Sequence, residues 1–157
     1  MISLNEPFLV GNEKKYLNEA VKSTWVSTNG HFLKKFCNKI NSILKIKYSF
    51  PCSSGTSALH LALLSVGVKK NDEIIVPSLT FIAPINAVKY VGANPIFMDV
   101  QEDHNLNIKK TIEFLEKKTY YKKNKSWNKK TNKNISAIII VHMWGHCSNI
   151  YKLIKFC

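Results

Sequence analysis

The chain has 157 residues, of which 45% are hydrophobic, so it is long enough to bury the core of one domain. Its formal net charge of +13 is typical of nucleic-acid-binding proteins. Two features argue against that class. Every basic residue is lysine, although arginine is the preferred reader of phosphates and guanine edges, and ten of the lysines are concentrated in residues 109–133.

No apolar stretch reaches the roughly eighteen residues that a membrane-spanning helix needs, and the first residues lack the basic and apolar regions of a secretory signal. A cytoplasmic location is therefore expected. The four cysteines, Cys37, Cys52, Cys147 and Cys157, form no C-x-x-C pair. This spacing predicts reduced thiols rather than a zinc site or a disulfide framework.

Residues 1–47 are expected to form an N-terminal helical segment. Apolar residues at helical spacing predict helices over residues 12–22 and 32–44. The turn-forming run at 23–30 separates the two helices.

Residues 48–157 alternate between helical and strand patterns. After a short extended stretch at 48–52, helices are predicted from residue 55 to Gly67 and over 80–90, 108–118 and 149–156. Strands are predicted over 73–77, 95–100 and 135–141. This alternation predicts an α/β layered fold with a mostly parallel sheet. The polar insertion at 119–134 is expected to be a surface loop or a hairpin.

Small and hydroxylated residues begin the helix predicted from residue 55. The first turn of a helix has unpaired N–H groups and a partial positive charge, and Gly55 lacks the Cβ that would keep an anion away. Residues 53–56 could therefore form a phosphate-binding turn. An ordinary serine or threonine N-cap, which needs no ligand, is the alternative.

Two further segments follow predicted strands, where α/β sheets bind ligands: residues 78–81 and 142–146. His142 and His146 are not expected to bind a metal, because Gly145 makes a helix improbable there. Asp99 and Asp103 are interpreted as turn and capping groups rather than as a catalytic pair.

Eight runs of residues, in this order, carry a resemblance to a known family: 5–7, 11–13, 25–30, 53–63, 72–83, 86–88, 91–100 and 141–146. Together they resemble the DegT/DnrJ/EryC1/StrS family of aminotransferases, which use pyridoxal 5′-phosphate (PLP) and act on nucleotide-sugars. The N-terminal motif is similar to perosamine-synthase-like members, and the insertion at 119–134 looks like the branch that makes 4-amino sugars of the legionaminic-acid type.

The resemblance implies the large domain of a fold-type I PLP transferase, a three-layer α/β/α structure that is incomplete here. Residues 48–157 would be a partial PLP-binding domain with the insertion at 119–134. Family members transfer an amino group, usually from glutamate, to a keto sugar, here expected to be a 4-keto-6-deoxy nucleotide-sugar used for surface glycans. They act as homodimers, and no nucleic acid or membrane partner is implied.

The resemblance also implies roles for individual residues. Ser54, Gly55 and Thr56 match the phosphate-binding turn, and Phe81 matches the aromatic residue that stacks on the pyridine ring. A core phenylalanine is the alternative for Phe81. Trp25 and Asn29 are candidate substrate-binding residues, with a structural turn as the alternative.

Family members are more than twice as long as this chain. Their Schiff-base lysine, and the acidic residue that pairs with the pyridine nitrogen, match no residue here. This chain alone is therefore expected to be a truncated, inactive form with no catalytic residue of its own. The alternative is a non-catalytic module that binds a full-length subunit or another partner.

Overall fold

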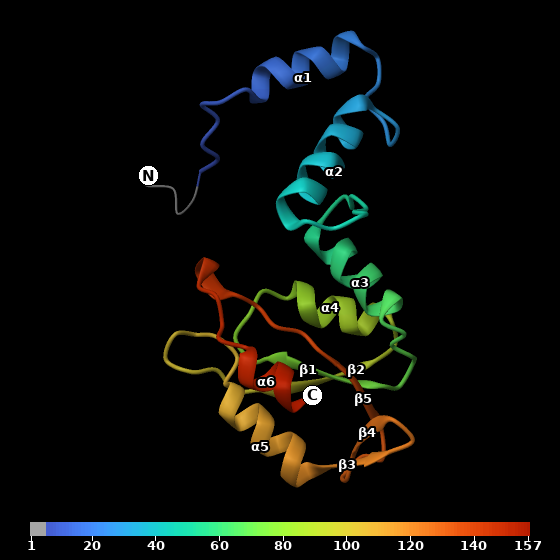
Figure 1. Cartoon of the computed structure of the whole chain (residues 1–157), viewed down its shortest axis with the longest axis vertical. Coiled ribbons are helices and arrows are strands. Elements are labelled where there is room, and N and C mark those ends of the chain that lie inside the picture. The colour runs from blue at the N-terminus through green and yellow to red at the C-terminus, as the bar shows by residue number, and fades with distance from the viewer. Residues whose placement is uncertain (1–5) are drawn as a thin grey trace. The chain divides into compact units, whose positions relative to one another are not determined.

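The computed structural model describes residues 6–157, so Asn5 of the first matching run lies outside the described residues. The chain forms two compact units, the first ending at Pro51 and the second running from Cys52 to Cys157 (Figure 1). Within the described residues, no helix is both long and apolar enough to span a membrane.

The first unit contains the two predicted helices, α1 (Glu13–Lys22) and α2 (His31–Leu44). Neither helix has a buried residue. They contact through aromatic side chains, since the ring centroids of Tyr16 and Phe32 lie 5.5 Å apart. Lys45 ends α2 in the left-handed conformation.

The second unit is built on one five-stranded sheet in the order β2-β1-β5-β4-β3. Its strands are β1 (Glu73–Pro77), β2 (Asn94–Met98), β3 (Thr119–Lys122), β4 (Lys125–Asn128) and β5 (Asn134–Ile138). β1 pairs in parallel with β2 and β5, whereas β3, β4 and β5 pair antiparallel. The α/β class is confirmed, and the sheet is mixed because the insertion at 119–134 forms a hairpin within it.

Helices cover both faces of this sheet (Figure 1). The side chains of Ile74 and Val76 pack in one apolar cluster with α3 (Gly55–Ser65) and α4 (Ala83–Tyr90). Ile75, between them in the strand, packs in a second cluster with α5 (Ile108–Lys118) and α6 (Tyr151–Phe156). This division follows from the alternation of side chains along a strand, and it produces the three-layer arrangement.

Residues with positive φ angles allow the chain to turn between the helices and strands. Gly67, which ends α3, has φ +83°, and Gly92, which follows α4, has φ +71°, a region that favours glycine. A Cβ at Gly92 would also lie 3.1 Å from Cγ of Lys70. In the hairpin, Lys123 and Asn124 both have positive φ, as a two-residue turn matched to the strand twist requires.

Several element boundaries differ from the sequence prediction: β2 ends at Met98 rather than at Val100, α6 begins at Tyr151 rather than at residue 149, and two others have a clear physical reason. The helix predicted from Thr80 begins at Ala83, because Pro84 is restricted to the first turn of α4. The strand predicted through Val141 ends at Ile138, and the N–H of Ile139 makes a last bond, 2.8 Å long, to the carbonyl of Ile75.

Asn105, a fully buried amide, connects two loops that are far apart in the sequence. Its Oδ1 accepts from the N–H of Met143 at 3.1 Å, and its Nδ2 donates to the carbonyl of His146 at 3.3 Å. Asp103 accepts from both the N–H and the Nδ2 of Asn105. These hydrogen bonds hold the pKa of Asp103 below its ordinary value, so the carboxylate stays charged at neutral pH.

Substituting Asn105→Ala should destabilise the second unit by about 1–3 kcal/mol, because the N–H of Met143 loses its buried acceptor. Urea denaturation of the purified chain measures this. Asn149→Ala, at an exposed position, is the control and should stay within about 0.5 kcal/mol of the parent. Equal midpoints for the two variants would contradict the assigned role.

Candidate functional site

The parallel strands place three loops at one edge of the sheet. β1, β2 and β5 run in the same direction, so the residues that follow them emerge from the same edge. These are residues 78–82 after β1, Asp99 and Val100 after β2, and 139–146 after β5. In open α/β sheets this carboxyl edge is where ligands bind.

The first turn of α3 has amide groups that the protein does not use. Ser54 is the N-cap, and its Oγ accepts from the N–H of Ser57 at 3.1 Å. The N–H groups of Gly55 and Thr56 precede the first intrahelical bond, which the N–H of Ala58 donates to the carbonyl of Ser54. Ser54 and Gly55 are exposed and Thr56 is half-buried, so these two amides are accessible to an anion.

The fold does not require a glycine at position 55. Its φ is not in the left-handed region, and a Cβ built on it would meet no atom within 4 Å. Glycine at this position therefore leaves open space directly over the helix terminus. Close approach of a ligand to the backbone is the physical use of such space.

Phe81 lies in the connection between β1 and α4, and 79% of its surface is exposed. The alternative that it is a core residue is therefore wrong. Thr80, its neighbour, has a buried Oγ1 with no hydrogen-bond partner among the described residues. Phe81 thus presents an aromatic face at the carboxyl edge of the sheet, on the same unit as α3.

The loop after β5 has an unusual backbone. The 3-10 turn η1 (Met143–Gly145) contains Trp144 at φ 53°, with 78% of its side chain exposed. His142 accepts from the N–H of Ser148 through Nδ1 at 3.0 Å. Asn105, which the sequence reasoning missed, holds both ends of η1; only the tertiary fold brings it there.

The two acidic residues near this edge have local partners. Asp99 forms an ion pair with Lys110 and accepts from the N–H of Val100. These bonds, the one from Lys110 above all, hold the pKa of Asp99 below its ordinary value. Asp103 accepts hydrogen bonds from Asn105, so each of the two carboxylates has a hydrogen-bond partner close to it. Within residues 6–157, no group of three metal-ligating side chains was found.

Trp25 and Asn29 belong to the first unit, in the turn between α1 and α2. Both are exposed, with 55% of the Trp25 surface accessible. The buried residue of this turn is Gly30, where a Cβ would lie 3.1 Å from the carbonyl oxygen of Trp25. The structure therefore groups Ser54, Gly55, Thr56 and Phe81 in one unit, with Trp25 and Asn29 in the other.

Comparison with known proteins identifies related sequences. Residues 8–157 match the model of the DegT/DnrJ/EryC1/StrS aminotransferase family. The chain is 40% identical over 154 residues to the GDP-perosamine synthase of Escherichia coli O157:H7, covering 98% of this chain and 38% of the relative. It is 35% identical to the GDP-perosamine synthase of Vibrio cholerae, covering 100% of this chain and 39% of the relative. The chain thus spans less than two fifths of these relatives.

Solved structures share the fold. A DegT DnrJ EryC1 StrS aminotransferase from Brucella abortus superposes with a TM-score of 0.77 at 24% identity, over 90% of this chain and 36% of that one. The GDP-4-keto-6-deoxy-D-mannose-3-dehydratase of E. coli, solved with bound hydrated PLP, gives 0.76 at 21% identity, over 98% of this chain and 37% of that one. The architecture of part of a fold-type I PLP enzyme is therefore confirmed. From the family match over residues 8–157, the chain belongs to the DegT/DnrJ/EryC1/StrS aminotransferase family.

Proposed function

We propose that this chain supplies the phosphate- and ring-binding part of a PLP-dependent aminotransferase that acts on a keto nucleotide-sugar. The single observation that carries the proposal is the first turn of α3, where two accessible amides lie beside a glycine that the fold does not require. The family supports PLP as the cofactor, and the names of two relatives, GDP-perosamine synthases, support a nucleotide-sugar substrate.

The residues present fit the cofactor. Ser54, Gly55 and Thr56 would hold its phosphate through the amides of Gly55 and Thr56 and the partial positive charge of the helix terminus. Phe81 would stack on its ring. When bound, PLP supplies the electron sink on which amino-group transfer depends.

Other residues would take part in the complete enzyme. Trp25 and Asn29, both exposed, are the proposed contacts to the nucleotide-sugar. The amino donor would be glutamate, the acceptor a 4-keto-6-deoxy sugar destined for surface glycans, and the active form a homodimer.

Substituting Gly55→Val should weaken PLP binding at least tenfold, because the new side chain occupies the approach to the two amides. A Cβ at this position meets no protein atom, so the thermal midpoint should change by no more than about 3 °C. Fluorescence titration with PLP measures affinity, and inorganic phosphate should compete. Ser65→Ala, an exposed serine at the other end of α3, is the control. Unchanged PLP affinity in Gly55→Val would refute the phosphate site.

Substituting Phe81→Ala should reduce affinity for PLP while leaving affinity for inorganic phosphate unchanged, since only the cofactor has a ring to stack. Stability should shift by no more than about 0.5 kcal/mol, because Phe81 is largely exposed. Parallel titrations with PLP and with phosphate separate the two contributions. An equal loss for both ligands would show that Phe81 acts on the fold rather than on the ring.

The purified 157-residue chain, mixed with PLP, glutamate and a 4-keto-6-deoxy nucleotide-sugar, should show no transamination above the buffer control. The reason is that no residue here matches the family's Schiff-base lysine, so a bound cofactor has no amine to exchange protons with substrate. Chromatography of the amino sugar product is the measurement. Robust turnover by the chain alone would show that one of its own lysines performs this role.

A further inference from the structure

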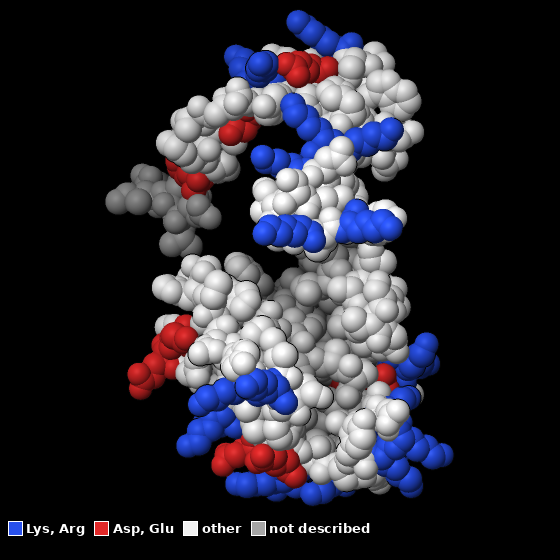
Figure 2. All heavy atoms as spheres, viewed as in Figure 1, with Lys and Arg blue, Asp and Glu red and all other residues white. Residues whose placement is uncertain are grey.

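The hairpin of β3 and β4 lies in a strongly positive segment of the chain. Residues 117–133, which contain the hairpin, carry eight lysines and no acidic residue. Figure 2 shows lysine side chains gathered over this part of the molecule, at the lower right of the view. Lys117 forms an ion pair with Glu113, and within residues 6–157 no other lysine of the segment has a carboxylate at ion-pair distance. The positive charge of the hairpin is therefore almost entirely uncompensated.

Three of these lysines meet at the tip of the hairpin. Lys122 and Lys125 are directly opposite each other in the strand register, and Lys123 lies in the turn between them with φ 55°. Like charges directly opposite each other destabilise a pair of strands, and a left-handed backbone favours glycine or asparagine over lysine. The tip is therefore less stable than it would be with uncharged side chains, and a negatively charged partner would relieve the repulsion.

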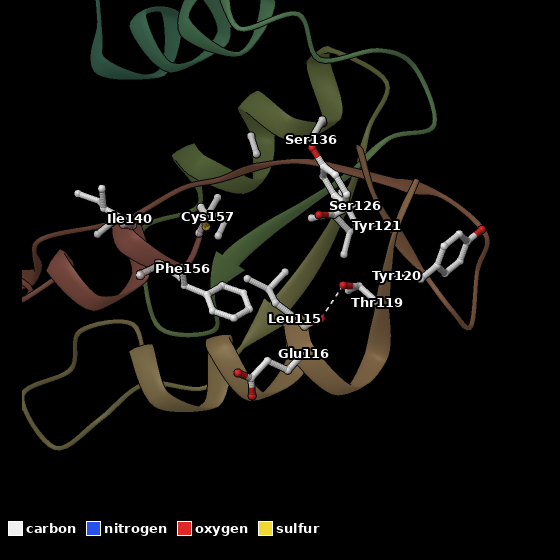
Figure 3. Close-up of a pocket in the computed structure, with 15 residues that line it drawn as sticks. Leu115, Glu116, Thr119, Tyr120, Tyr121, Ser126, Ser136, Ile140, Phe156 and Cys157 are labelled. Atoms are coloured by element: carbon white, nitrogen blue, oxygen red, sulfur yellow. Dashed lines mark hydrogen bonds between the residues drawn. The ribbon is translucent and has the colours of Figure 1, made fainter. Parts of the chain in front are cut away.

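Two aromatic rings share a face of the hairpin with these lysines. Tyr120 is opposite Trp127, and each lies two residues along its strand from Lys122 or Lys125, so the four side chains point to the same face. Figure 3 shows Tyr120 and Tyr121, consecutive residues of β3, pointing in different directions, as this alternation requires. Tyr120 is 37% exposed, and the half-buried Trp127 donates through Nε1 to the carbonyl of Lys122 at 3.2 Å. This hairpin face, formed by Tyr120, Lys122, Lys125 and Trp127, combines two aromatic rings with two positive charges.

The chemistry of the hairpin face suits a lipid surface. Tyrosine and tryptophan are enriched where an apolar phase meets water, because each ring is apolar and carries one polar group. Clusters of about four to eight lysines or arginines bind anionic lipid headgroups through their charge. Arginine recognises an individual phosphate through two parallel hydrogen bonds, whereas lysine is a compact point charge, and this chain has no arginine. A surface of many equivalent phosphates needs only the charge.

Two other partners fit the hairpin face less well. Single-stranded nucleic acid is held in a positively charged groove that follows its backbone. The hairpin face lies instead on the two outer strands at one end of the sheet (Figure 1). A second copy of the chain would bring the same lysines and a net charge of +13, so the two surfaces would repel each other.

We propose that the hairpin face, with Lys123 at its tip, adsorbs to the surface of an anionic lipid bilayer. The lysines would lie among the headgroup phosphates, and the two rings would lie at the level of the headgroups. The family resemblance implies no membrane partner, so this contact goes beyond it. β4 pairs with Asn134 and Ile135, the first residues of β5, whereas the candidate cofactor site lies at the carboxyl edge of the sheet. The proposal therefore does not depend on the cofactor site.

Vesicle flotation tests this contact, because bound protein rises with the vesicles and aggregated protein does not. The purified chain is mixed with vesicles of phosphatidylcholine alone, or of equal parts phosphatidylcholine and phosphatidylglycerol. The hairpin variant carries Lys122→Gln, Lys123→Gln and Lys125→Gln. The matched control changes the net charge equally at exposed positions of the first unit, through Lys14→Gln, Lys15→Gln and Lys34→Gln.

The parent chain and the control should bind the phosphatidylglycerol vesicles with equal affinity. The hairpin variant should bind at least tenfold more weakly, since each lysine at an anionic surface strengthens adsorption several-fold. None of the three proteins should float with phosphatidylcholine alone. In about 1 M NaCl, where the Debye length falls to about 3 Å, the parent chain should no longer bind.

A second measurement changes no lysine, so it holds even if the hairpin variant is unstable. Trp25→Phe with Trp144→Phe leaves Trp127 as the sole tryptophan, and Trp127→Phe with Trp144→Phe leaves Trp25. Anionic vesicles with spin-labelled headgroups should quench the fluorescence of Trp127 and leave that of Trp25 unchanged.

Four results would overturn the proposal. The first is no flotation of the parent chain with the anionic vesicles. The second is an equal loss of binding in the hairpin variant and the control, which would reduce the effect to net charge. The third is quenching of Trp25 as strong as that of Trp127, which would place a different surface on the bilayer. The fourth is a single-stranded oligonucleotide that the parent chain binds more tightly than the vesicles and the hairpin variant does not bind, which would assign the face to nucleic acid.

Discussion

The structure of the second unit depends on the complete burial of β1. Ile74, Ile75 and Val76 have no exposed surface, and their side chains alternate between two apolar clusters. A strand that is apolar on both faces cannot remain in contact with water on either, so helices must cover both sides of the sheet. The parallel pairing of β1 with β2 and β5 then brings the loops that follow all three strands to one edge.

The mixed sheet reflects how the polar insertion was added to this core. The hairpin of β3 and β4 pairs only with the beginning of β5, and one buried hydrogen bond ties it to the centre of the sheet. Asn128 donates to the carboxylate of Glu73 at 2.8 Å, and both residues are buried. An unpaired carboxylate at that depth would be costly, so the amide of β4 both satisfies Glu73 and holds the hairpin in place. Because β4 is short, the rest of β5 has no strand partner on that side within residues 6–157.

The features that indicate a function are those that do not contribute to the stability of the fold. Ser54 satisfies the amide of Ser57, but the amides of Gly55 and Thr56 remain available, and Gly55 is not required by its backbone angle or by its neighbours. Phe81 contributes an aromatic ring to solvent rather than to the core. Each of these arrangements loses stabilisation that a cap, an alanine or a buried ring would supply. Under the proposed function, the phosphate and the aromatic ring of the cofactor would restore it.

The sequence by itself determined the elements whose signal is local. The helices α1, α2, α3 and α5 and the strand β1 follow from apolar periodicity, Gly67 and Gly92 from their backbone freedom, and the α/β class from alternation. The family could also be predicted from the sequence, because several of its motifs occur in the same order along the chain. The tertiary structure decided what depends on contacts between distant residues. Asn105 forms hydrogen bonds with a loop about forty positions away, and Phe81 is exposed although phenylalanine is typical of a core. Among the described residues, β5 beyond Ile135 has a strand partner on one side only. Periodicity records only which face of an element is apolar, whereas pairing and burial depend on what the rest of the chain places beside it.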